Sequence, residues 1–232
     1  MLSEIRTSPM GPYLDASPLF PPGVGAFVTL RGFEEVSPEG LARFLSLLGL
    51  PCRRVHRVNQ VHSGRVVDPE EAPCDADALV STEIGEWVRV VTADCVPILM
   101  ASEDGRAVAA VHAGWKGTLA RIVEEAGRRL LEGRQPGAAY VGPAVHPCCY
   151  GVPEERVERF RRAFPGWIPE VPGAPRLDLV ELNLRMLDGL GFPEPFIHIE
   201  DRCTACGDGV CCSYRRDGER AGRMAALIGR TA

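Results

Sequence analysis

Three near-continuous apolar runs of strand length, residues 87–93, 97–101 and 107–112, constrain the fold of this chain more than any other feature. Strands whose consecutive positions are all apolar are typically buried on both faces, so they need packed layers on each side of their sheet. An amphipathic helix is predicted directly after them, over residues 118–131, because apolar side chains recur there at helical spacing. The centre of the chain is therefore predicted to be a buried sheet covered by a helix.

Further helices and strands are predicted on both sides of this centre. Ser37 and Pro38 mark a helix start, because serine caps helices and proline suits the first turn. Residues 1–23, rich in proline and glycine, are expected to wrap the surface, and residues 224–228 suit either a helix end or a closing strand. The predicted helices cover residues 37–48, 153–164 and 179–190, and the predicted strands cover residues 25–30, 65–67, 78–80, 138–141 and 196–199.

Strand and helix alternate irregularly along the 232 residues, and no repeat or linker divides them. This order does not favour a doubly wound sheet, in which strands and helices alternate regularly. The sequence predicts a single α/β (α+β) domain over residues 1–232, with mixed β-sheets packed against flanking helices.

The charge of the chain excludes some classes of partner. Its formal net charge is −5 and its pI is about 5.6, so it has no electrostatic reason to bind nucleic acid or an anionic membrane. No apolar stretch reaches the length of about 18 residues that spans a bilayer, and the first residues lack a signal-peptide pattern. We therefore expect a cytoplasmic protein whose nine cysteines act as thiols, ligands or nucleophiles.

Three short segments at the ends of apolar runs combine metal-ligand residues with tight-turn residues, and they contain His62, Cys95 and His112. Imidazole nitrogens and a thiolate satisfy zinc, and three protein ligands leave the fourth position to a water that loses its proton near neutral pH. The long spacing leaves other interpretations open. Cys95 could be a small buried thiol, His112 a core histidine, and His62 a surface loop residue.

Short motifs follow one another along nearly the whole chain, at residues 60–62, 93–97, 112–117, 142–150, 203–204, 213–218 and 222–223. In this order they resemble the motifs of the YfiH family, also called the laccase-domain or multicopper polyphenol oxidase family. Three departures are Ser63 in place of the usual glycine, Gly151 in place of an acidic residue, and Cys211–Cys212 where aromatic residues are common.

This resemblance implies a YfiH-like fold in which His62, Cys95 and His112 bind zinc. It implies purine nucleoside phosphorylase activity on adenosine, inosine and guanosine, so that purine nucleosides and phosphate are the expected partners. Methylthioadenosine phosphorolysis and adenosine deamination are implied as companion reactions. The family's older label implies the alternative of a Cu²⁺-dependent polyphenol oxidase. Multicopper oxidases need many histidines to build a trinuclear copper centre, however, and this chain has only five.

Phosphorolysis requires phosphate to be held beside the ribose, and basic side chains or the N–H groups at a helix start suit that task. Lys116 and Gly117 lie at the start of a predicted helix and are the first candidates, although a plain helix-entry turn explains them too. Arg31 is a second candidate, with a solvated turn residue as the alternative. Asp94 is a candidate general base or histidine partner beside Cys95, provided that the strand ends there.

Three further residues are assigned to the substrate. The amide of Gln60 is expected to contact a purine edge, and Tyr214 and Arg215 are expected to close the pocket from the C-terminal segment. Two competing hypotheses remain: a hydrolase that uses Cys95 and His112 directly, and a metal-dependent binding protein, for which no unused apolar helix stripe is evident. The sequence does not decide the oligomeric state or the preferred nucleoside.

The remaining cysteines permit several interpretations. Cys203 and Cys206 form a Cys-x-x-Cys, with Cys211 and Cys212 nearby. Such thiols can hold a structural zinc, form a disulfide or remain free. Free thiols are favoured because a second Cys-x-x-Cys of the same spacing is missing. Cys148 and Cys149 match a family segment and are given no catalytic role.

Overall fold

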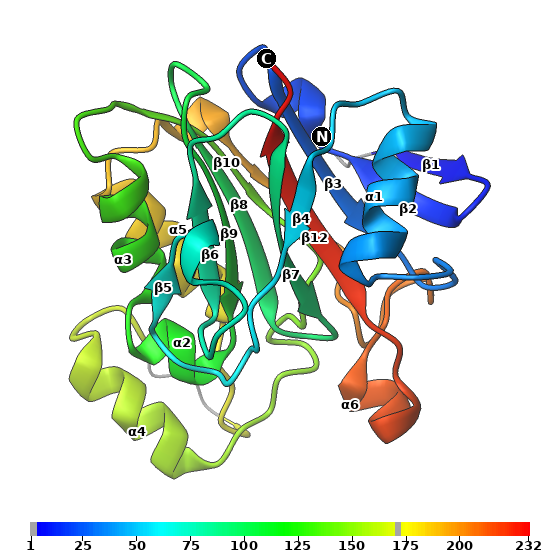
Figure 1. The fold of residues 1–232 in the computed structure, drawn as a ribbon. Coiled ribbons are helices and arrows are strands. Elements are labelled where there is room, and N and C mark those ends of the chain that lie inside the picture. The colour runs from blue at the N-terminus through cyan, green and yellow to red at the C-terminus, as the bar shows by residue number, and fades with distance from the viewer. Residues whose placement is uncertain (1–3, 170–172) are drawn as a thin grey trace.

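Two six-stranded mixed sheets form the framework of the computed structural model, which describes residues 4–169 and 173–232 (Figure 1). The first sheet has the order β1 (Ile5–Ser8), β2 (Gly11–Asp15), β3 (Val24–Thr29), β12 (Met224–Arg230), β7 (Glu86–Thr92) and β4 (Arg54–His56). The second has the order β11 (Ile197–Ile199), β10 (Pro136–Val141), β8 (Val96–Ser102), β9 (Val108–Ala113), β6 (Ala78–Ser81) and β5 (Val66–Val67). Most neighbours are antiparallel, while β4–β7, β10–β11 and β5–β6 are parallel.

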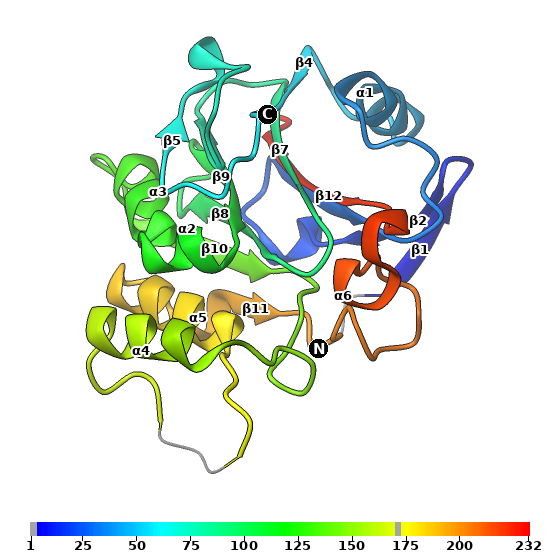
Figure 2. The same ribbon diagram turned by 90° about the horizontal axis from the view of Figure 1, so that it is seen from below.

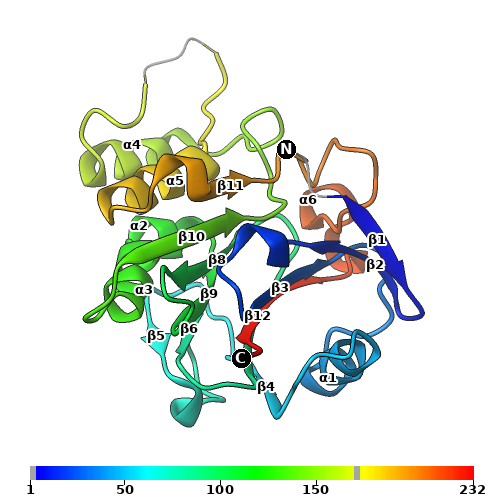
Figure 3. The same ribbon diagram turned by 90° about the horizontal axis from the view of Figure 1, so that it is seen from above.

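Helices cover the outer faces of the two sheets, as the views from below and above show (Figures 2 and 3). The second sheet packs against helices that lie on the side away from the first sheet, and α1 covers the outer face of the first. A separate apolar core, which includes Val90, Leu99 and Ile228, fills the space between the sheets. The helices are α1 (Pro38–Leu47), α2 (Trp115–Leu119), α3 (Ile122–Leu130), α4 (Glu154–Ala163), α5 (Leu179–Gly189) and α6 (Tyr214–Asp217).

These layers confirm the predicted α/β fold with mixed sheets and flanking helices, and several local predictions hold. The three apolar runs become β7, β8 and β9, and every residue of β8 and β9 is buried. Ser37 caps α1 as expected, because its side chain accepts a hydrogen bond from the Gly40 N–H. The C-terminal segment forms β12, the closing strand, which lies between β3 and β7 (Figure 1).

Two expectations are wrong, and one strand was not predicted. Residues 4–23 do not merely wrap the surface, since they include the β1–β2 hairpin at the edge of the first sheet; residues 1–3 lie outside the described residues. Strand β4 has no predicted counterpart. The helix expected over residues 118–131 is divided at Arg121, whose φ of 58° is left-handed. Tertiary contacts hold this break, because the Arg121 guanidinium donates to the Ala163 carbonyl and stacks over Phe164.

Chain crossings between the two sheets position the functional site. The β7–β8 turn passes from the first sheet to the second, and the segment between β4 and β5 makes a second crossing. The end of β9 leads into α2 at the same place, so three separate segments converge. Across the described ranges, none of the helices has the length and apolar character that crossing a membrane requires.

Glycines beside Trp87 test the packing of the first sheet. The fully buried indole lies over Gly25 and Gly229, and an alanine Cβ at Gly229 would lie 2.4 Å from Trp87 Cδ2. We predict that Gly229→Ala lowers the free energy of unfolding by about 1–3 kcal/mol, with a fall in Tm of roughly 2–4 °C per kcal/mol. Gly189→Ala is the control, since no atom lies within 4 Å of its Cβ position. Equal Tm values for the two variants would contradict this account.

Candidate metal centre and cavity

The predicted ligands His62, Cys95 and His112 meet at one point. Their ligand atoms all lie within 4.8 Å of one another, and Cys95 Sγ is 4.0 Å from His62 Nε2. His62 comes from the segment between β4 and β5, Cys95 from the β7–β8 turn, and His112 from β9. Since the three side chains converge from distant parts of the chain, the fold brings together a ligand set that local spacing could not define.

The carboxylate of Asp77, which is fully buried, organises this convergence. Its Oδ1 accepts hydrogen bonds from His112 Nδ1 at 2.8 Å and from the His62 N–H at 3.0 Å. Its Oδ2 accepts from the N–H and the hydroxyl of Ser63 and from the N–H of Val61. One carboxylate therefore fixes both the loop that carries His62 and the ring orientation of His112. With Nδ1 bonded to Asp77, the other nitrogen of His112 is directed to the centre.

Electrostatics in this cluster favour a cation. Burial would raise the pKa of Cys95, but hydrogen bonds from His112 and His62 outweigh it and lower that pKa to about 7. Burial would lower the pKa of His112, but Asp77 and Cys95 outweigh it and raise that pKa to about 9. Without a metal, the thiolate and the imidazolium therefore stabilise each other. A divalent metal ion that replaces the proton would also place positive charge beside the thiolate.

Two of the residues that shape the centre have a left-handed backbone. His62 has a φ of 60° and Asp94 a φ of 98°, values that non-glycine residues rarely adopt. Asp77 holds the first conformation through the His62 N–H. The second is held by Asp94 itself, which accepts hydrogen bonds from the Thr204 hydroxyl at 2.6 Å and the Arg215 N–H at 2.7 Å. Such strain, held by surrounding contacts, is typical of functional sites.

The space between the ligands fits a metal ion. A Cβ at Gly114 would lie 2.9 Å from His62 Cδ2 and 3.1 Å from Cys95 Sγ, so glycine keeps this space open. Two imidazoles and one thiolate are a donor set that suits zinc and also copper. The three ligands leave a coordination position open, as catalytic centres do.

A cavity of about 920 Å³ opens at this centre. Guanidinium groups and aromatic rings dominate its walls, and Asp94 is the one carboxylate among its described lining residues. Arg156 lies over the Trp115 ring at 4.4 Å, and Arg215 lies over the Tyr150 ring at 4.9 Å. The lining arginines are Arg57, Arg89, Arg156, Arg215 and Arg223, and the aromatic residues are Trp115, Tyr150 and Tyr214. Such a cavity is suited to an anion and to a planar ring.

Arg89 on β7 is the most informative of these cations. Its exposed fraction is only 9%, its Nε has no hydrogen-bond partner, and within the described residues no carboxylate forms an ion pair with it. Burial, and then the charge of Arg57, lowers the pKa of Arg89 to about 10, and the charge of Glu39 opposes this shift only in part. A buried, unpaired guanidinium is unfavourable by itself, so this position calls for an anionic ligand.

The structure divides the predicted substrate residues into two groups. Gln60, Asp94, Tyr214 and Arg215 line the cavity together with the metal ligands, and the other predicted residues do not. The Gln60 amide is paired with Val91, because its nitrogen donates to the Val91 carbonyl and its oxygen accepts from the Val91 N–H, both at 2.7 Å. It thus anchors the loop to the edge of β7 rather than presenting a free amide to a purine.

Four of the predicted residues have other neighbours than expected. Asp94 does not contact a histidine through its described hydrogen bonds; the partner of His112 is Asp77. Lys116 is exposed beside the Trp115 ring, and Gly117 is buried against Ser63 and His112 in the five-residue helix α2. Neither lines the cavity. Arg31 lies instead near Cys212 and Asp217. Burial raises the pKa of Cys212 and the charge of Arg31 only opposes this shift, while Arg216 and then Arg31 lower the pKa of Asp217.

Asp77 and Arg89 are functional candidates that the sequence motifs do not include. Each leaves one recognisable feature in the sequence. Arg89 is the single charged residue inside the apolar run over residues 87–93, and Asp77 immediately precedes the strand predicted at 78–80. A charged residue in a buried strand requires a partner, so the sequence alone could have indicated both residues as functional candidates.

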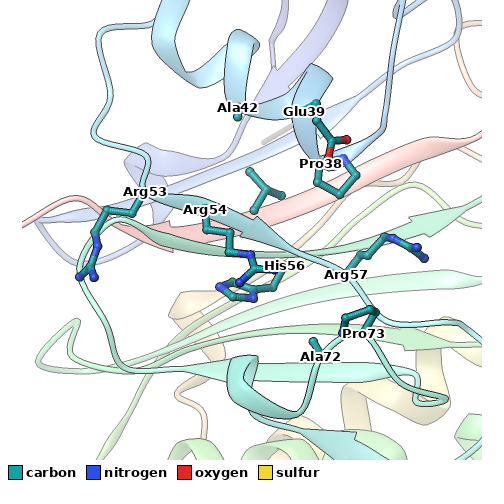
Figure 4. Close-up of a pocket in the computed structure, with 10 residues that line it drawn as sticks. Pro38, Glu39, Ala42, Arg53, Arg54, His56, Arg57, Ala72 and Pro73 are labelled. Atoms are coloured by element: carbon teal, nitrogen blue, oxygen red, sulfur yellow. The ribbon is translucent and has the colours of Figure 1, made fainter.

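A smaller hollow of about 300 Å³ lies beside β4 and α1 (Figure 4). It also contains a histidine, His56, together with Arg53, Arg54 and Arg57. His56 Nε2 is paired with the Glu86 carboxylate at 2.5 Å, and no cysteine lines this hollow in the described part of the chain. The hollow therefore lacks the donor set found at the larger cavity.

The fold and site define a class: mixed two-sheet domains with a His₂Cys cluster that opens into an arginine-lined cavity. Residues 34–231 match the family model described as multi-copper polyphenol oxidoreductase laccase, and the chain belongs to this family. The predicted family relationship is thereby confirmed.

Individual relatives agree with this assignment. The chain is 37% identical to a protein of Deinococcus radiodurans named purine nucleoside phosphorylase, over 82% of this chain and 76% of that protein. YlmD from Geobacillus stearothermophilus has a TM-score of 0.82 and 26% identity, covering 99% of this chain and 100% of that one. The fold is also that of the hypothetical protein YfiH from Bacillus licheniformis, with a TM-score of 0.76, 24% identity, and coverage of 89% and 92%.

The role of Asp77 can be tested through metal affinity. We predict that Asp77→Asn weakens zinc binding by about 10–100-fold, because partners that orient a ligand histidine contribute effects of this size. Competition with a chromophoric chelator measures the affinity. Asp75→Asn, an exposed neighbour, is the matched control and is expected to bind zinc like the parent chain. An unchanged affinity in Asp77→Asn would show that the carboxylate does not organise the centre.

Proposed function

We propose that this protein is a zinc-dependent purine nucleoside phosphorylase, which converts a purine nucleoside and phosphate into the free base and ribose 1-phosphate. One observation carries the proposal: the His₂Cys centre opens directly into a cavity rich in guanidinium groups and aromatic rings. The relative from Deinococcus radiodurans that is named for this activity supports the choice of substrate class.

Phosphate is assigned to the region of Arg89 and Arg57. Arg89 is buried without a carboxylate partner among the described residues, and Arg57 lies close enough for its charge to lower the pKa of Arg89. A phosphate dianion would neutralise both charges through charge-assisted hydrogen bonds, which guanidinium groups form in pairs. The arginines then hold the nucleophilic oxygen beside the ribose and reduce its repulsion from other anions.

The aromatic rings are assigned to the nucleoside. Trp115 and Tyr150 offer planar faces at the cavity wall, and the guanidinium groups of Arg156 and Arg215 lie over these same rings. A purine can stack against such surfaces and orient the ribose toward the phosphate. In the reaction, a phosphate oxygen bonds to C1′ as the C1′–N9 bond breaks. The bonding electrons leave with the base, which takes up a proton as the attacking hydrogen phosphate loses one.

Zinc bound by His62, Cys95 and His112 would supply a Lewis acid and would lower the pKa of a bound water to about 7. Within the protein, Asp77 keeps a proton on Nδ1 of His112 and so leaves its other nitrogen for the metal. We include two companion reactions in the proposal: phosphorolysis of methylthioadenosine, and deamination of adenosine by water with release of ammonia. Both would use the same contacts to the base and the ribose.

The distribution of histidines does not favour the copper oxidase alternative. His56, which lies on β4, is paired with Glu86 on β7, and His198 lies on β11. Among the described residues, only two groups of metal-ligand side chains occur, and His62 and His112 are the sole histidines in them. A trinuclear copper centre needs many more imidazoles. A hydrolase that uses Cys95 as its nucleophile would require a free thiol there, so bound zinc distinguishes it from the proposal.

Chromatography of products tests the reaction class. We expect inosine to yield hypoxanthine and ribose 1-phosphate only when phosphate is present, with a loss on the order of 10²-fold or more in Cys95→Ala, because a direct ligand matters at least as much as its supporting partner. Cys74→Ala, which changes a cysteine outside both metal-ligand groups, is the control. Base release that is independent of phosphate, or retained in Cys95→Ala, would contradict the proposal.

Steady-state kinetics of Arg89→Gln test the phosphate site. The loss of charge-assisted hydrogen bonds of about 1.5–3 kcal/mol predicts a rise of roughly 10–100-fold in the KM for phosphate. The KM for inosine is expected to change much less. Arg53→Gln, an exposed arginine at the smaller hollow, serves as the control. Equal effects of Arg89→Gln on both KM values would show that Arg89 does not contact phosphate.

A further inference from the structure

A second cluster of metal-ligand side chains lies outside the His₂Cys centre. The sulfur atoms of Cys148, Cys149, Cys203 and Cys206 all lie within 4.8 Å of one another. Cys148 Sγ and Cys206 Sγ are 3.6 Å apart, which is far longer than the S–S bond of about 2.05 Å in a disulfide. All four are free cysteines. The cluster joins a turn that follows β10 to a turn that follows β11.

The partners of Cys203 differ from those expected from the sequence. Cys211 and Cys212 lie close by along the chain, but both are buried in the apolar core between the two sheets. Cys148 and Cys149 take their place beside the Cys-x-x-Cys. A second Cys-x-x-Cys is therefore not needed to complete a set of four thiols.

The backbone forms a tight turn around Cys203. The backbone of His146, Ala205 and Cys206 lies beside its sulfur. The turn is closed by a hydrogen bond of 2.9 Å from the Gly207 N–H to the Cys203 carbonyl. A Cβ at Gly207 would lie 2.6 Å from that carbonyl oxygen, so this tight turn requires glycine. Fixed ligand geometry is a feature of metal-binding cysteines.

Positive charges support both arms of the cluster. Arg176 Nη1 donates to the carbonyls of Pro147 and Cys148, both at 2.5 Å. Arg216 Nη1 donates to the Thr204 carbonyl at 2.8 Å. A divalent ion with four thiolates carries a net charge of −2, which the Arg176 guanidinium would partly neutralise. The charge of Arg216 is already paired with Asp217.

We propose that Cys148, Cys149, Cys203 and Cys206 form a second metal site that holds one structural zinc ion. Four thiolates around one tetrahedral ion suit zinc. With Zn–S bonds of about 2.3 Å, tetrahedral sulfurs are about 3.8 Å apart, close to the separation of 3.6 Å between Cys148 and Cys206. Since protein ligands fill all four positions, the site is closed and has a structural role.

The ion would stabilise one wall of the cavity. Cys149 immediately precedes Tyr150, which lines the cavity. Thr204 immediately follows Cys203, and its hydroxyl donates to Asp94 in the turn that carries Cys95. A zinc ion that joins the two turns would therefore fix Tyr150 and Asp94 relative to each other without contacting substrate.

Metal analysis of the full chain, expressed with zinc, tests the site. We expect two zinc ions per chain in the parent protein, one in Cys95→Ser, one in Cys206→Ser, and fewer than one in the double variant. Cys52→Ser, which changes a cysteine outside both clusters, should keep two. The loss of the structural ion should also lower Tm in Cys206→Ser. Retention of two zinc ions in Cys206→Ser would overturn the proposal.

Zinc-edge X-ray absorption of Cys95→Ser provides a readout that does not depend on folding of the Cys206 variant. The expected spectrum has a shell of four sulfur atoms at about 2.3 Å and no nitrogen or oxygen ligand. A mixed shell, or no bound zinc, would overturn the proposal. So would a disulfide or four alkylatable thiols among these cysteines, as detected by the mass of the parent protein after alkylation.

Discussion

The candidate metal centre depends on the hydrogen bonds that the buried carboxylate of Asp77 accepts. Through two oxygens this carboxylate holds three consecutive backbone N–H groups, at residues 61–63, and the imidazole of His112. Burial raises the pKa of Asp77, but the hydrogen bonds from His112 and Ser63 outweigh it and lower that pKa, so the group remains ionised. The left-handed backbone at His62 persists because this carboxylate holds it.

The two-sheet framework explains why the centre lies where it does. Segments that pass from one sheet to the other supply His62 and Cys95, while β9 supplies His112 and also forms part of the rigid core. Tight turns at strand ends expose ligand side chains without disturbing the buried strands. The cavity at this centre is also lined by arginines that lack carboxylate partners in the described structure, above all Arg89. Fold and charge thus place a His₂Cys cluster and several arginines around one cavity.

Much of the fold could be predicted from the sequence because its central strands have strong local patterns. The break at Arg121 and the hairpin of residues 5–15 could not, since tertiary contacts and sheet pairing override local preference there. Motifs in the sequence pointed to His62, Cys95 and His112, which the fold brings within 4.8 Å of one another. The role of Asp77 arises from contacts with the loop at residues 61–63, which spacing does not reveal. Likewise, Cys148 and Cys203 become neighbours only through the pairing of β10 with β11.

Anomalous diffraction at the zinc edge, from crystals grown with zinc and phosphate, tests the central claim most directly. The account predicts a zinc peak bonded to His62 Nε2, Cys95 Sγ and His112 Nε2, with its fourth position facing the cavity. It also predicts phosphate in contact with the Arg89 guanidinium. A fourth protein ligand that closes the coordination, or no zinc between these three side chains, would contradict a catalytic metal centre at this position.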